Sequence, residues 1–269
     1  MMAAWRGWWR RCLPTSDPLA AFRLDGQTAL ITGPVRGIGL AIARLFAGAG
    51  ARLVLADIDG AACDALAEEL GGISIPTDVG DATAIACLAE RAEAQAGGID
   101  ILVCNAGIAG PASPLHVLDE AERERLYAIN LLHPLRLTGH IAPAMAARGR
   151  GNIVLLSSIA GLRGNAVLGH YGMTKAALAQ LARNLAVEWG PSGVRANAIA
   201  PGLIETDWAG AILSSPERAA RRLGLTPLRR AGSPDEIAAT ALYLASDAGG
   251  FTTGQTIVVD GGTLISDGS

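Results

Sequence analysis

The sequence has little of what marks disulfide-rich, metal-binding or membrane proteins. Its four cysteines (Cys12, Cys63, Cys87 and Cys104) show no C-x-x-C spacing, so neither a disulfide framework nor a zinc finger is expected. Its four histidines form no metal-like constellation. No apolar run approaches the ~20 residues that a membrane-spanning helix needs. We therefore expect a cytoplasmic protein with reduced thiols, without a metal and away from the membrane.

The chain also lacks an excess of charge of either sign. Lys and Arg number 22 against 25 Asp and Glu, and the formal net charge of −3 gives no reason to expect a nucleic-acid partner. A length of 269 residues suits one domain with a large core.

What the sequence does contain is an alternation of short apolar runs and helical segments. Unbroken apolar strands suit a sheet that is covered on both faces, and alternating strand and helix units make such a sheet parallel. We predict an α/β fold, a doubly wound parallel sheet of about seven strands with helices on both faces. The expected strands lie near 28–32, 52–57, 73–76, 101–105, 152–156, 195–199 and 256–259. The expected helices lie near 37–49, 60–70, 81–96, 119–147, 171–189 and 234–246.

A glycine-rich turn joins the first strand to the first helix. The strand ends at Gly33, and Gly37 and Gly39 open the helix, a geometry that presents backbone N–H groups to a phosphate. The second strand ends at Asp57, whose carboxylate can accept both hydroxyls of an adenosine ribose. Ligands of such sheets bind beyond the carboxyl ends of the strands. Five candidate residues fall at such ends: Gly33, Asp57, Asn105, Ser158 and Pro201.

Tyr171 and Lys175 are four residues apart on a predicted helix and therefore share a face. An ammonium beside a phenol lowers the phenol pKa from its free value near ~10 and creates a base that works near neutral pH. Ser158 follows an apolar strand and offers a hydroxyl that can orient a carbonyl or alcohol oxygen.

Taken in order, these motifs resemble the short-chain dehydrogenase/reductase family. They are Thr32-Gly33-x-x-x-Gly37-Ile38-Gly39, Asn105-Ala106-Gly107, Asn130, Ser158, Tyr171-x-x-x-Lys175 and Pro201-Gly202-x-x-x-Thr206. The resemblance runs from Phe22 to the C-terminus and includes the late segment FTTGQTIVVDGG. It implies an NAD(P)(H)-dependent oxidoreductase with a Rossmann-like fold, usually oligomeric.

The resemblance also implies roles for individual residues. Asn130 would hold a water that links Lys175 to solvent, and Asp78 would lie near the adenine. The catalytic set implied is Asn130, Ser158, Tyr171 and Lys175. The cofactor-binding set implied is Gly33, Arg36, Gly37, Ile38, Gly39, Asp57, Ile58, Asp78, Val79, Asn105, Ala106, Gly107, Tyr171, Lys175, Pro201, Gly202, Ile204 and Thr206.

The choice between NAD and NADP depends on charge. The Asp57 carboxylate would repel a 2′-phosphate, because a desolvated contact between like charges costs several kcal/mol. Ile58 offers that phosphate no cation, whereas Arg36 could pair with it. Pro34 removes one possible N–H donor from the turn. We predict NAD as the cofactor in preference to NADP, with modest affinity.

The predicted dehydrogenase domain covers 22–269, and two segments need separate mention: the extension before it and a lid within it. Residues 1–21 hold three of the five tryptophans and read as a disordered or peripheral extension, with a membrane-surface or targeting helix as the alternative. Residues near 203–227 are where the family has its substrate lid; Trp208 could cover a substrate there. Its arginines, Arg218, Arg221 and Arg222, read as a solvated face. His170 receives no catalytic role, because neighbours on a helix point apart.

Three functions agree with these residues. The first is an NAD(H)-dependent dehydrogenase that interconverts a secondary alcohol, such as a polyol or sugar, with its ketone. The second is an NADPH-dependent 3-oxoacyl-thioester reductase, against which Asp57 speaks. The third is a non-catalytic dinucleotide-binding regulator, against which the complete set of four catalytic residues speaks. We also predict an oligomer, because the helices near 119–147 and 171–189 are apolar on more than one face. The resemblance implies that these two helices pack against their symmetry mates, and a second interface near the C-terminal VVDGG segment would complete a homotetramer.

Overall fold

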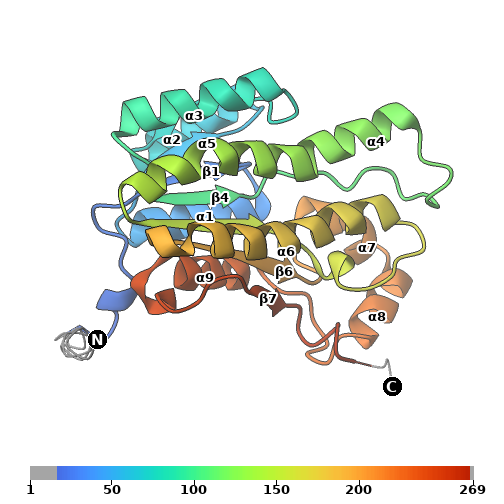
Figure 1. Cartoon of the computed structure of the whole chain (residues 1–269). Coiled ribbons are helices and arrows are strands. Elements are labelled where there is room, and N and C mark those ends of the chain that lie inside the picture. Colours follow the sequence, from blue (N-terminus) through green and yellow to red (C-terminus); the bar gives the residue numbers. More distant parts are fainter. Residues whose placement is uncertain (1–16, 267–269) are drawn as a thin grey trace, which may run out of the picture.

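The structure, a computed structural model, describes residues 17–266 and has the predicted doubly wound architecture (Figure 1). Within that range the sheet is seven-stranded and parallel, in the order β3-β2-β1-β4-β5-β6-β7. The strands are β1 (Thr28–Thr32), β2 (Arg52–Ala56), β3 (Ile73–Ser74), β4 (Ile101–Cys104), β5 (Gly151–Leu156), β6 (Val194–Pro201) and β7 (Thr256–Val259). The order reverses direction at β1, and β1 and β4 pair in register from Ala29↔Ile101 to Thr32↔Cys104.

Helices cover both faces of the sheet, so side chains that alternate along each strand enter two separate cores. Leu30 and Leu102 pack in one core with α3 (Ala82–Ala96), α5 (His133–Ala147) and α6 (Gly169–Trp189). Ile31 and Val103 pack in the other core with α1 (Gly37–Gly48), α2 (Gly60–Leu70) and α9 (Pro234–Ala245). Every residue of β1 is buried, which explains the apolar run at its centre, Ala29–Ile31.

Side chains at the helix ends explain where several helices begin. The Asp59 side chain caps α2 by accepting from Ala62 N at 3.1 Å, and Asp81 caps α3 in the same way. Helix α9 begins with a capping box, in which Ser233 and Glu236 each accept from the other's backbone N–H.

The prediction of one continuous helix near 119–147 is wrong in detail. The segment is divided into α4 (Glu120–Tyr127), a π-helical turn (Ala128–Leu132) and α5. Pro134, in the first turn of α5, has no N–H to donate to the carbonyl of residue 130, so regular α-helical bonding is interrupted here. Such π turns are frequent at functional sites, and this one carries Asn130.

Small differences at the strand ends move some candidate residues. Strand β3 is two residues long rather than four, and β6 extends to Pro201, which closes the strand rather than opening the loop. Asp57, Asn105 and Ser158 lie just beyond the last residues of β2, β4 and β5. The candidate residues therefore gather at the carboxyl edge of the sheet.

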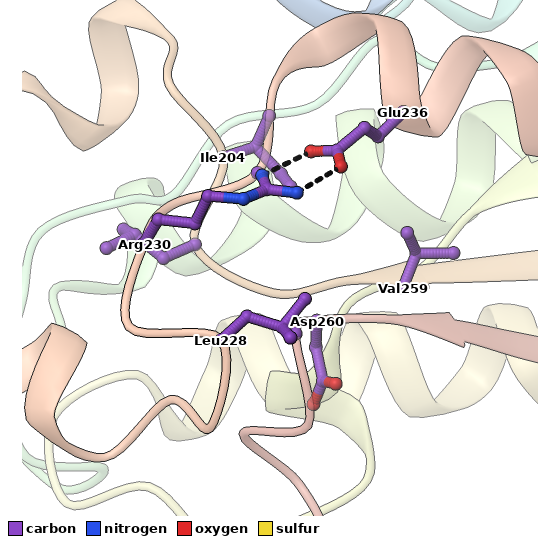
Figure 2. Close-up of a pocket in the computed structure, with 9 residues that line it drawn as sticks. Ile204, Leu228, Arg230, Glu236, Val259 and Asp260 are labelled. Carbon is purple, nitrogen blue, oxygen red and sulfur yellow. Dashed lines mark hydrogen bonds and ion pairs between the residues drawn. The ribbon is translucent and has the colours of Figure 1, made fainter.

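The predicted lid forms two short helices, α7 (Asp207–Leu213) and α8 (Pro216–Gly224), whose supporting segments meet at the base. Ile204 and Gly232 form a parallel bridge, and Gly232 donates to and accepts from the backbone on either side of Ile204, both at 2.9 Å. Figure 2 shows Arg230 and Glu236 facing each other above Asp260, and their ion pair is 2.6 Å long. These contacts fix both ends of the lid to α9.

The prediction for residues 1–21 falls largely outside the described residues. Of that segment only 17–21 is described, and it leads into a short 3₁₀ turn at Ala20–Phe22. None of the helices that the structure describes is long and apolar enough to cross a membrane.

Candidate active site

The glycine turn before α1 has the conformation of an anion cradle. Gly33 and Gly37 have φ values of 69° and 54°, in the left-handed region that glycine adopts without strain. Arg36 occupies the N-cap position but its side chain does not cap the helix, and the first turn of α1 carries no acid. The helix N-terminus therefore presents N–H groups and a positive dipole end that suit a pyrophosphate.

Close backbone approach explains the third glycine and the neighbouring asparagine. A Cβ on Gly39 would collide with the Gly33 carbonyl oxygen and lie 2.5 Å from Asn105 Nδ2. The Asn105 amide donates to the carbonyls of Thr32 and Gly33 at 3.1 and 2.7 Å. Asn105 thus ties the end of β4 to the glycine turn.

Asp57 lies at the end of β2 and is only 8% exposed. Its Oδ1 accepts from Asp59 N at 3.1 Å, which fixes the carboxylate against the backbone. Ile58 beside it is 67% exposed, and Arg36 is exposed as well. Asp78 closes a turn by accepting from Gly80 N at 2.8 Å, so the structure gives this residue a local role.

Tyr171 and Lys175 are buried on the first turns of α6, against the end of β5. Lys175 Nζ donates to Leu156 O at 2.7 Å and lies 5.6 Å from the centre of the Tyr171 ring. The Ser157 hydroxyl donates to the Lys175 carbonyl at 2.7 Å and holds α6 on the strand. Burial lowers the pKa of Lys175 to about 8.

The pKa of Tyr171 is raised in the structure, whereas the sequence predicted that Lys175 would lower it. Burial raises the pKa of the Tyr171 phenol above its ordinary value, and the Ser158 hydroxyl opposes that rise. The predicted lowering by Lys175 is therefore not the dominant effect in the protein alone. Ser158 Oγ accepts from Ala160 N at 3.1 Å, which leaves the serine O–H available as a donor.

Asn130 is fully buried at the π turn and binds the segment that follows β4. Its amide accepts from Ile108 N at 2.8 Å and donates to Ile108 O at 2.7 Å. A Cβ on Gly107 would lie 3.3 Å from Asn130 Oδ1 and 3.4 Å from Lys175 Nζ. Gly107 therefore allows Asn130 and Lys175 to approach one point.

The start of the lid reaches both the glycine turn and the tyrosine. The Thr206 methyl group would lie 3.2 Å from a Cβ on Gly37, and Pro201–Ile204 lead into this contact. The Trp208 ring stands edge-on to Tyr171, with centroids 5.2 Å apart. Arg218 and Arg221 are exposed as predicted, whereas Arg222 is half-buried and burial lowers its pKa.

A small hollow opens beside Tyr171. It includes one residue that our sequence reasoning set aside, His170, whose Nε2 lies 3.0 Å from Leu115 O. The sequence could have pointed to His170 only through its position next to Tyr171. The contact with Leu115, 55 residues away, could not be predicted from the sequence.

The residues at this edge fit a nicotinamide dinucleotide. The glycine cradle and the uncapped α1 terminus suit its pyrophosphate, and the carboxylate at the end of the neighbouring strand suits a ribose. The buried Lys175 and the phenol lie beyond β5, on the other side of the point where the strand order reverses.

Comparison with known proteins agrees with this arrangement. Residues 33–263 match the family described as Enoyl-(Acyl carrier protein) reductase. A galactitol 2-dehydrogenase (L-tagatose-forming) of Cereibacter sphaeroides is 43% identical over 254 residues, which cover 93% of this chain and 99% of that protein. The chain belongs to the short-chain dehydrogenase/reductase family. It is therefore an oxidoreductase that uses a nicotinamide dinucleotide.

Solved members of the short-chain dehydrogenase/reductase family share the whole fold. A gluconate 5-dehydrogenase from Burkholderia cenocepacia, in complex with NADP and tartrate, has a TM-score of 0.89 at 34% identity and covers 93% of this chain and 100% of its own. A 7α-hydroxysteroid dehydrogenase, complexed with NADH and 7-oxoglycochenodeoxycholic acid, has a TM-score of 0.84 at 37% identity and covers 90% and 96%.

Proposed function

We propose that this short-chain dehydrogenase/reductase interconverts a secondary alcohol, such as a polyol or sugar, with its ketone and prefers NAD(H). The observation that carries the proposal is the meeting of Tyr171, Ser158 and Lys175 beside the end of β5, under the lid residue Trp208. The relatives support the chemistry, since they include enzymes named for galactitol, gluconate and a hydroxysteroid.

The hydroxyl groups of Tyr171 and Ser158 both hydrogen-bond to the substrate oxygen. Tyr171 donates a proton to the carbonyl oxygen in reduction and accepts it from the alcohol in oxidation. Ser158 Oγ accepts from Ala160 N, and its O–H remains free to donate to the same substrate oxygen. The nicotinamide supplies or accepts the hydride at the neighbouring carbon. This division of work needs no metal ion.

Lys175 and Asn130 support the phenol. The Lys175 ammonium lies 5.6 Å from the centre of the Tyr171 ring, and a positive charge at that side favours the phenolate over the phenol. We further propose that the nicotinamide ribose binds this ammonium. Asn130 fixes Ile108 and contacts Thr174 Oγ1 at 3.4 Å, and the proton relay to solvent passes along this side of Lys175.

The preference for NAD rests on the buried Asp57 carboxylate, which would meet a 2′-phosphate with like charge. Arg36 is the opposing charge. The solved relatives include one with NADH and one with NADP, so the residues of this chain carry the argument. We propose that Ile38, Val79, Ala106 and Gly202, which were also assigned to cofactor binding, contact the cofactor at the same edge of the sheet.

Two alternatives make different predictions. A 3-oxoacyl-thioester reductase would use NADPH and an acyl thioester, and the matching family description also names an acyl-carrier reductase. A non-catalytic regulator would bind the dinucleotide without turnover. A panel of polyols, sugars, cyclic alcohols and 3-oxoacyl thioesters, read by the absorbance of the reduced cofactor with NAD and NADP, separates all three.

We also propose a homotetramer in the cytoplasm. Val187 on α6 is 81% exposed, and Phe251 before β7 is fully exposed, so each of these two places presents an apolar side chain to the outside. Light scattering tests the mass, and Val187→Asp should reduce the oligomer, whereas Gln95→Asp on the exposed face of α3 adds the same single negative charge elsewhere. A wild-type mass equal to one chain of 27.5 kDa would refute it. The cytoplasmic location rests on the free thiols of Cys63, Cys87 and Cys104.

A further inference from the structure

The hollow beside Tyr171 is mainly apolar. It lies between the segment after β4, α4 and the first turn of α6. The residues that line it are Ala109, Pro111, Ser113, Leu118, Leu126, Val167, Leu168, Gly169, His170 and Tyr171. A substrate whose reacting oxygen meets Tyr171 would place the rest of its carbon skeleton here.

His170 is held in one orientation at this hollow. Its Nε2 lies 3.0 Å from Leu115 O, and because a carbonyl can only accept, Nε2 must carry the hydrogen. The Tyr127 ring meets the imidazole edge-on, with centroids 6.1 Å apart and planes at 67°. These two contacts fix the tautomer of the neutral ring and the plane of the imidazole.

The other ring nitrogen, Nδ1, is a buried acceptor without a partner. In the neutral ring with hydrogen on Nε2, Nδ1 has only a lone pair. It is buried, and no residue within 17–266 donates to it. A buried acceptor that has lost its water and gained no donor is costly, so an additional hydrogen-bond donor at this position would bind favourably.

We propose that His170 Nδ1 accepts a hydrogen bond from a second hydroxyl group of the substrate, away from the carbon that reacts. This inference rests on the proposed function and narrows its substrate class to alcohols that carry at least two hydroxyls on an otherwise apolar-packed skeleton. His170 is then a specificity-determining residue. An alcohol without the second hydroxyl leaves Nδ1 unpaired and is the poorer substrate.

Two substitutions separate the acceptor from the tether. In Gln the terminal amide nitrogen is as many bonds from Cβ as Nε2 is in His, so His170→Gln keeps the donor to Leu115 O and loses the acceptor. In Asn the amide oxygen takes the place of Nδ1, so His170→Asn keeps the acceptor and loses the tether. His140→Gln, on the exposed surface of α5, is the matched control.

The test compares kcat/KM for cyclohexanol with that for the cis and trans forms of its 1,2-, 1,3- and 1,4-diols. In the wild type at least one diol should exceed cyclohexanol by about 10- to 100-fold, the worth of pairing one buried polar group. His170→Gln should abolish that ratio, mainly through an increase in KM for the diol. His170→Asn and His140→Gln should keep most of the ratio.

Each other outcome has a separate meaning. Turnover of cyclohexanol without preference for any diol overturns the role of His170 and leaves the proposed function intact. Loss of the ratio in His170→Asn with retention in His170→Gln shows that only the tether to Leu115 matters, which also overturns it. If the Gln variant does not fold, the wild-type ratio and the Asn variant still decide. A wild type that oxidises neither cyclohexanol nor any diol, yet reduces a 3-oxoacyl thioester, refutes the proposed function itself.

Discussion

Trp208 stands edge-on to Tyr171, with the two ring centroids 5.2 Å apart and the ring planes at 83°. The tryptophan comes from α7 of the lid, whereas the tyrosine comes from α6. The lid therefore helps to bury the phenol, and burial is the largest influence that raises the pKa of Tyr171. The position of the predicted lid and the acidity of Tyr171, the proposed catalytic group, are linked through this one contact.

Removal of Trp208 should thus alter the pH dependence of the reaction. In Trp208→Ala water reaches the phenol, its pKa falls, and the basic form that oxidation needs is populated at lower pH. The rise of kcat with pH in the direction of alcohol oxidation should shift to lower pH, whereas Trp208→Phe should keep the wild-type profile. An unchanged profile in the alanine variant would break the proposed link.

Tyr171→Phe tests the chemistry directly. The variant lacks the group that moves the proton, so turnover should fall by ~10²–10⁴, the usual contribution of a positioned acid or base. Binding of the reduced cofactor, measured by its fluorescence, should be preserved. Tyr243→Phe is a suitable control because its hydroxyl bonds to Thr252 near β7. Near-normal turnover in Tyr171→Phe would rule out the mechanism.

Asp57 should decide the cofactor. The ratio of kcat/KM for NAD over NADP should narrow in Asp57→Ala, because the repulsion of a 2′-phosphate disappears, and should reverse in Asp57→Arg. Arg36→Ala is the comparison, and it should raise the preference for NAD by removing the opposing cation. A wild type that uses NADP at least as well as NAD would show that Arg36 outweighs Asp57.

Lys175 should lower the stability of the fold at neutral pH. Burial lowers its pKa to about 8 from the ordinary lysine value of 10.5, so the folded state binds this proton less tightly than the unfolded state. Stability then increases as pH rises from about 8 to 10.5, and below pH 8 the full penalty of roughly 3 kcal/mol applies.

Lys175→Met should therefore unfold at higher urea concentration than the wild type at pH 7, and the difference should shrink by pH 10. Urea titrations at both pH values measure it, with Lys175→Arg as the variant that keeps a charge. The loss of the bond to Leu156 O opposes the gain by about 1 kcal/mol. A difference that does not vary with pH would contradict this assignment.

His133 should make the stability of the fold sensitive to acid, in a pH range below that of Lys175. It is fully buried beside the π turn, its Nδ1 bonds to Ile129 O, and burial lowers its pKa to about 4. Because the unfolded chain takes up the proton near pH 6.5, stability should fall as pH decreases from 6.5 to 4. His133→Phe should flatten that part of the stability profile in thermal unfolding, whereas His116→Phe should not.

The sequence by itself determined the order of strands and helices and the edge at which the site lies. Unbroken apolar runs such as β1 specify a sheet covered on both faces, and parallel pairing brings Gly33, Asp57 and Ser158 to one side. These inferences need only local periodicity and general rules of chain connection, which is why the strands were placed within a few residues of their observed bounds.

The tertiary structure alone decided how the site is tuned. The hydrogen bonds of Asn130 to Ile108, the contact of Trp208 with Tyr171 and the bond of His170 to Leu115 each join residues distant in sequence. Burial of Tyr171 and Lys175 follows from those contacts, and burial sets the direction of both pKa shifts. The sequence specifies which residues can carry a charge. How far those residues are shielded from solvent is determined only when the helices and strands pack together.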